Sequence, residues 1–218
     1  MTSNSAESGT TPIREVSGLS SGQAVRSRVN GLIVHRLSKD TPSARALRAQ
    51  LRSALGKETG SIPAIWDLTL DDESQYLGNN PTRGEKAVHG ALTLWARHQG
   101  SNKRLMHDTS DHPRRFASAI RVVAEIQRGE KQRGEKRAEE TPIYRSFSAA
   151  IQAPTYEGLL VRLRSLVSQL EAAEVPCDYG YLASDLFHWQ DPSRRTSVVR
   201  NWGRQFARTT QTASESAQ

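Results

Sequence analysis

Apolar residues recur at intervals of three and four along almost the whole chain, and no stretch alternates apolar and polar residues for long enough to form a convincing strand. In residues 23–37, for example, Val25, Val29, Ile33 and Leu37 are each four positions apart. Such intervals place side chains on one face of an α-helix, whereas alternation is typical of a strand. The pattern therefore predicts an all-α protein, folded as a helical bundle or bundles of about seven to nine helices.

Helix start and stop signals divide this pattern into elements. Thr41-Pro42 supplies a start and Gly56 a stop, because proline is tolerated in the first turn and glycine ends helices. We expect further helices over residues 85–98, 157–174, 179–189 and 193–208, and one that starts near Pro113. The expected organisation is a disordered tail over 1–20, an N-terminal helical region over 21–127, a charged linker over 128–142, a C-terminal helical bundle over 143–208 and a disordered tail over 209–218.

Three of the four tryptophans fall on apolar helical faces, namely Trp95, Trp189 and Trp202, and we expect them in the core. The position of Trp66, in a short loop between helices, is left open.

Positive charge is concentrated in two segments. The chain carries a formal net charge of +7, and residues 19–57 contain eight basic residues against one acidic residue, while residues 192–208 contain five arginines and no carboxylate. Arg45, Arg48 and Arg52 lie within about 60° of arc on one predicted helix. Arginine suits bidentate phosphate contacts, although a GC-rich genome would produce the same excess of arginine over lysine. Aligned cations without base-reading residues favour a protein that binds nucleic-acid backbones.

Other chemistry has little support in the sequence. One cysteine, Cys177, excludes an internal disulfide and a cysteine-cluster zinc site, and no phosphate-loop or dinucleotide-binding motif occurs. The segment from His107 to His112 holds two histidines and two aspartates, but it precedes Pro113, where aspartate and serine cap helices. We expect no enzyme activity, cofactor or metal. Without a signal peptide or an apolar run of about 18 residues, we expect a cytoplasmic protein with no membrane partner.

The C-terminal third carries an ordered set of motifs. Val175-Pro176-Cys177-Asp178 forms a turn, Asp185-Leu186 and Trp189 follow on one helix, and Trp202 and Phe206 lie on the last helix. Together with Arg114-Arg115-Phe116 and an arginine-rich second helix, this order resembles the CasB family, the small subunit of the type I-E CRISPR surveillance complex Cascade. The resemblance covers about residues 22–208.

This resemblance implies a non-catalytic, all-α subunit that packs against a second copy of itself and against the backbone and large subunits of the complex. It also implies contacts with guide RNA and with the target and displaced non-target DNA strands, which would stabilise the R-loop. The expected phosphate contacts are Arg45, Arg48, Arg52, Arg114, Arg115, Arg200 and Arg204, with Arg26, Arg28, Arg36, Arg162 and Arg164 as weaker candidates.

Two alternatives stay open. A stand-alone basic helical regulator that binds duplex DNA would need a helix aimed at base edges and a preferred sequence. A metal-dependent nuclease would depend on residues 107–112 alone.

Overall fold

The computed structural model describes residues 19–71, 79–130 and 141–207, and everything within these ranges is helix, turn or loop apart from one isolated bridge between His107 and Cys177. The all-α prediction is confirmed. The elements in chain order are α1 (Gly22–Leu32), the π-helical turn η1 (Ile33–Leu37), α2 (Pro42–Ala54), the 3-10 turn η2 (Pro63–Ile65), α3 (Trp66–Thr69), α4 (Arg83–Gln99), α5 (Phe116–Glu130), α6 (Pro142–Ile151), α7 (Tyr156–Ala172), α8 (Tyr179–Trp189) and α9 (Pro192–Ala207).

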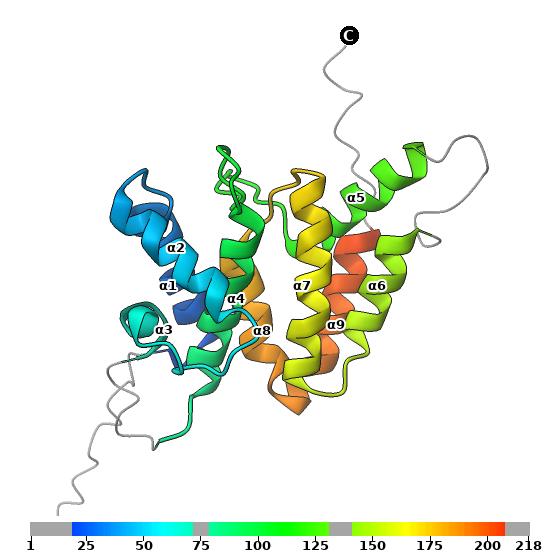
Figure 1. The fold of residues 1–218 in the computed structure, drawn as a ribbon. Helices are drawn as coiled ribbons and strands as arrows, with labels where there is room; N and C mark the ends of the chain where they lie inside the picture. Colours follow the sequence, from blue (N-terminus) through cyan, green and yellow to red (C-terminus); the bar gives the residue numbers. More distant parts are fainter. Residues whose placement is uncertain (1–18, 72–78, 131–140, 208–218) are drawn as a thin grey trace, which may run out of the picture.

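Helices α1 to α4 form one side of the molecule, and α5, α6, α7 and α9 form the other (Figure 1). Helix α8 lies between the two sides, where it packs against α1, α4, α5 and α9. One continuous apolar core runs through both sides. Helix α8 therefore crosses from the expected C-terminal bundle into the N-terminal side, while α5, from the expected N-terminal region, packs on α6 and α9.

Side-chain caps set several of the helix boundaries. The Thr41 hydroxyl accepts a hydrogen bond from the Ala44 N–H at the start of α2, and Gly56, just beyond the end of α2, adopts a left-handed φ of 84°. Helix α4 begins with a capping box in which Thr82 and Glu85 each bond the backbone of the other. The bounds of α2 agree with the start and stop signals in the sequence, because capping depends on local residue types. Helix α4 begins at Arg83, two residues before the expected start at residue 85.

The helix expected over residues 23–37 changes its hydrogen bonding halfway. It is α-helical to Leu32 and then π-helical, although Val25, Val29, Ile33 and Leu37 are all fully buried as expected. The sequence analysis did not predict α6 as a separate helix and only included its region in the C-terminal bundle.

Trp95, Trp189 and Trp202 are fully buried, which confirms the expected core positions. Trp66 is 47% exposed, and its indole donates a 2.6 Å hydrogen bond to the Gly60 carbonyl. Its ring therefore covers the loop before α3 rather than filling the core.

The expected charged linker is described only at its ends. Helix α5 continues to Glu130 and α6 begins at Pro142, while residues 131–140 lie outside the described residues. The expected terminal tails likewise lie outside them, except at residues 19 and 20, where the Leu19 N–H donates to Asp71. No helix in the described ranges is long and apolar enough to cross a membrane.

Candidate nucleic-acid interface

Arg45, Arg48 and Arg52, whose spacing placed them on one face of a helix, line one groove of about 580 Å³. The groove lies between α2, with the turn that precedes it, and the loop that follows α4. Lys39 and Lys103 also line it, so five cations face one carboxylate, that of Asp40. This excess of positive charge makes the groove suitable for a polyanion.

Packing of α2 determines which way its arginines point. Ala44, Leu51 and Ala54 are buried on the face of α2 that packs against α4, roughly 100° around the helix from the arginines. The arginines are left on the solvent side, because residues three and four apart share a helical face.

The other wall of the groove is held by Gln99 at the end of α4. Its side-chain amide donates to the carbonyls of Asn102 and Arg104 at 2.7 and 2.9 Å, and its oxygen accepts from the Met106 N–H at 3.0 Å. These three bonds fix the loop that carries Lys103. The sequence gives little sign of this arrangement, because it depends on one buried glutamine side chain.

The groove arginines are engaged to different degrees. Arg48 is half-buried and donates to the carbonyls of Leu37 and Lys39 at 2.6 and 3.2 Å, so it stabilises the turn between η1 and α2. Arg45 forms a 2.9 Å ion pair with Asp40, whose side chain is 89% exposed. Exposed pairs of this kind contribute at most about 1 kcal/mol, so a phosphate can replace the aspartate.

Three groove cations remain open to a ligand. Arg52, Lys39 and Lys103 are exposed, and no carboxylate or carbonyl in the described ranges accepts a hydrogen bond from their side chains. They are the groups with the most donor capacity left for phosphate oxygens.

Two further expected contacts, Arg28 and Arg36, converge on Asp67 in α3. Arg36 forms a 2.6 Å ion pair with its carboxylate, and Arg28 donates to its carbonyl at 2.8 Å. Both arginines tie α1 and η1 to α3, and their pairing reduces the charge available there to a nucleic acid.

Arg114 and Arg115 precede α5 and point to different partners. The Arg114 N–H donates to Asp108 at 2.7 Å, its carbonyl accepts from Asp178, and its guanidinium lies 3.5 Å from the Pro176 carbonyl. Arg115 stacks on the ring of Tyr181, on which the weaker candidate Arg26 also stacks.

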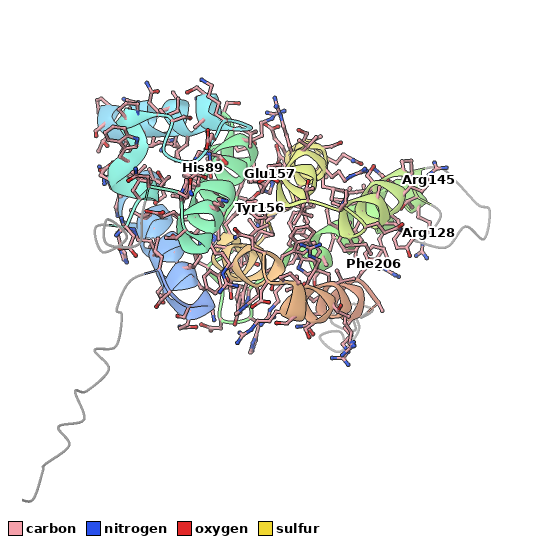
Figure 2. All side chains as sticks on the ribbon, turned by 90° about the horizontal axis from the view of Figure 1, so that it is seen from below. His89, Arg128, Arg145, Tyr156, Glu157 and Phe206 are labelled. Atoms are coloured by element: carbon pink, nitrogen blue, oxygen red, sulfur yellow. The ribbon has the colours of Figure 1, made fainter. Side chains whose placement is uncertain are left out.

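The remaining expected phosphate contacts are exposed residues of α7 and α9. They do not line the groove, and the pair on α7 does not come together with the pair on α9. They are Arg162 and Arg164 on α7, and Arg200 and Arg204 on α9. Arg164 lines a second cleft of about 620 Å³ together with His89, Tyr156 and Glu157, whose positions are labelled in Figure 2.

In the histidine–aspartate segment at 107–112, the side chains of His107 and Asp108 accept hydrogen bonds from backbone N–H groups. His107 accepts a hydrogen bond from the Tyr179 N–H at the start of α8, and Asp108 accepts from Ser110 and Arg114. Burial lowers the pKa of His107, which keeps the ring neutral as an acceptor.

Among the described residues, no cluster of histidine, cysteine and carboxylate side chains could hold a metal ion. Cys177 is buried, and burial raises the pKa of its thiol.

Comparison with known proteins gives consistent matches. Residues 47–206 match the family described as CRISPR-associated protein Cse2 (CRISPR_cse2). The crystal structure of CasB from Thermobifida fusca is similar, with 31% sequence identity, a TM-score of 0.64, and coverage of 85% of this chain and 96% of that chain. No curated protein sequence matches.

Two more distant structures share the fold. CasB from Thermus thermophilus is 20% identical with a TM-score of 0.56, over 85% of this chain and 96% of that one. A chain in a structure described as a CRISPR RNA-guided surveillance complex is 20% identical with a TM-score of 0.52, over 86% of this chain and 94% of that one.

Proposed function

Because the chain belongs to the CRISPR-associated Cse2 family, we propose that it is a non-catalytic subunit of an RNA-guided CRISPR surveillance complex of the Cascade type. The similar fold of a chain within such a complex supports this proposal. In that setting the partners are the backbone and large subunits, a second copy of this chain, the guide RNA and the two DNA strands.

Within the complex, the chain binds nucleic-acid backbones and stabilises the R-loop. The groove between α2 and the loop after α4 is the observation that carries this proposal, because five cations line it against one carboxylate. Base pairing with the guide reads the sequence, so a subunit of this kind needs phosphate contacts and no base contacts. Because R-loop formation is nearly balanced in energy, a few such contacts shift the equilibrium.

The number of phosphates that the groove can hold depends on how many of its cations are free of other partners. Arg52, Lys39 and Lys103 are free, Arg45 becomes free when Asp40 is displaced, and Arg48 keeps its bonds to the turn. Three or four phosphates correspond to a slope of about −2 to −3 when the logarithm of the affinity for a single strand is plotted against the logarithm of salt concentration.

A salt titration tests the groove directly. The full chain is titrated with a labelled single-stranded DNA 30-mer and with a random duplex of equal length, from low to physiological salt. We expect affinity for both probes to fall linearly on logarithmic axes, and R52Q/K103Q to reduce the single-strand slope by about 1.4. The R128Q/R145Q variant removes the same charge from the exposed surfaces of α5 and α6 (Figure 2) and should leave the slope unchanged.

Other results would overturn parts of the proposal. Absence of binding at low salt would remove the nucleic-acid role and leave the family assignment. Equal effects of R52Q/K103Q and R128Q/R145Q would show that only net charge matters. A clear consensus sequence selected from random duplexes would favour the stand-alone regulator. Co-purification with the other subunits of the complex tests the assembly role separately.

A further inference from the structure

Two arginines from different parts of the chain stack on one tyrosine ring. The guanidinium carbon of Arg26, on α1, lies 3.5 Å from the ring centroid of Tyr181, on α8. That of Arg115, just before α5, lies 3.8 Å from the same centroid. Two guanidinium groups this close to one centroid would overlap on the same face, so they occupy opposite faces and are about 7 Å apart.

Stacking leaves the hydrogen-bonding edges of both guanidiniums free. The ring covers one face of each planar group, while the N–H donors lie in its plane and point away from the contact. In the described ranges, no acceptor bonds the guanidinium of Arg26 or Arg115. Both side chains are half-buried, so the two donor edges are held in fixed positions near the surface.

The acidic groups around the stack are already committed to other donors. Asp178 caps α8 and accepts from the Tyr181 N–H at 3.0 Å, and Asp185 accepts from the Trp202 indole at 2.7 Å. Neither carboxylate lies within ion-pair distance of Arg26 or Arg115 in the part of the chain that the structure describes, although the charges of Asp185 and Arg115 attract each other at longer range. Two cations about 7 Å apart repel each other, and bound anions would relieve that repulsion.

We propose that Arg26 and Arg115 form a second phosphate-binding site, which holds two neighbouring phosphodiesters of one nucleic-acid strand, and that Tyr181 is its positioning residue. The inference rests on the proposed backbone-binding function and adds a site with a defined ligand spacing. Arg26 and Arg115 were expected contacts from the sequence, but their pairing through Tyr181 was not.

This site is separate from the groove. Arg26 precedes Leu37 by eleven residues of continuous helix, which is about 16 Å along the helix axis, and the carbonyl of Leu37 accepts from the groove residue Arg48. One chain can therefore hold two stretches of nucleic-acid backbone at the same time.

Substitutions at Tyr181 test its positioning role without changing charge. Y181F keeps an aromatic face and should bind the single-stranded 30-mer like the wild type. Y181L keeps both arginines but loses their support, and should weaken binding roughly three- to tenfold. The double variant R26Q/R115Q keeps the tyrosine and should reduce the salt slope by about 1.4. Thermal unfolding of each variant is measured alongside binding.

The results distinguish this inference from the groove proposal. If Y181L and R26Q/R115Q unfold at lower temperature but bind like the wild type, while R52Q/K103Q binds weakly, the stack is purely structural and only this inference fails. If R26Q/R115Q weakens binding and R52Q/K103Q does not, the groove is not the interface and this site is. If Y181L fails to fold, R26Q/R115Q against the R128Q/R145Q control still decides the outcome.

Discussion

The indole Nε1 of Trp202 donates a 2.7 Å hydrogen bond to the Oδ2 atom of Asp185, and so joins α9 to α8. Burial raises the pKa of Asp185 to about 6, and the indole bond and the charge of Arg115 partly oppose this shift. The two motif residues that mark the C-terminal third in the sequence are therefore direct partners in the core.

The raised pKa predicts how D185N will respond to pH. Because the folded state favours the protonated aspartic acid, the contribution of Asp185 to stability is fully present below pH 4 and is lost as pH rises through 6. Asparagine has no charge to bury and still offers an oxygen to Trp202. We expect the stability of D185N relative to the wild type to improve by about 2 kcal/mol between pH 4 and pH 7.5, measured by urea denaturation.

The variant W202F serves as the control for this prediction. It removes the donor that stabilises the ionised carboxylate, so we expect it to cost more stability at pH 7.5 than at pH 4. Parallel pH profiles for the wild type and D185N would contradict the assigned pKa shift.

His98 predicts the opposite pH response. It is fully buried, its Nδ1 lies 2.8 Å from the hydroxyl of Tyr179, and burial lowers its pKa to about 4. A lowered pKa means that stability is fully present above pH 6.5 and is lost as pH falls towards 4. As the pH falls, protonation of His98 should lower the free energy of unfolding of the wild type by up to about 3 kcal/mol. In H98Q this loss should be absent. Guanidinium denaturation at pH 7.5 and pH 4.5 measures the difference, and an unchanged acid sensitivity in H98Q would exclude this role.

A pair of helical glycines gives a prediction about packing. A Cβ at Gly84, in the first turn of α4, would meet the carbonyl oxygen and side chain of Leu19, whereas a Cβ at Gly203, in α9, would meet open space. Alanine is favoured over glycine in helices by about 1 kcal/mol. We therefore expect G203A to raise the melting temperature and G84A to lower it, because the segment at Leu19 must shift. Equal increases for both variants would show that Leu19 does not pack on α4.

Local chemistry explains which parts of the fold the sequence predicted. The bounds of α8 agree with the structure because Asp178 caps its start, and Asp191-Pro192 follows its end. The π-helical turn at Ile33–Leu37 could not be predicted, because residues four apart lie on one face in either kind of helix. The grouping of Arg45, Arg48 and Arg52 followed from their spacing, but the contribution of Lys103 depends on the loop that Gln99 holds.

The difference between Arg48 and Arg52 is a tertiary effect that no helical pattern contains, and it gives the last prediction. Arg48 donates to the carbonyls of Leu37 and Lys39, whereas Arg52 has no acceptor in the described part of the chain. We expect R48A to lower stability by about 1 to 2 kcal/mol, because the part-buried carbonyl of Leu37 loses a charged donor. We expect R52A to leave stability within about 0.5 kcal/mol and to reduce the single-strand salt slope by about 0.7.

Measuring both properties on both variants separates support of the turn from phosphate binding. The variant R48K retains the charge but not the planar group that reaches two carbonyls, so it should remain less stable than the wild type. If R48A proved as stable as the wild type and lost as much of the salt slope as R52A, Arg48 would be a phosphate contact equal to Arg52. Its bonds to the turn would then be exchanged for phosphate on binding.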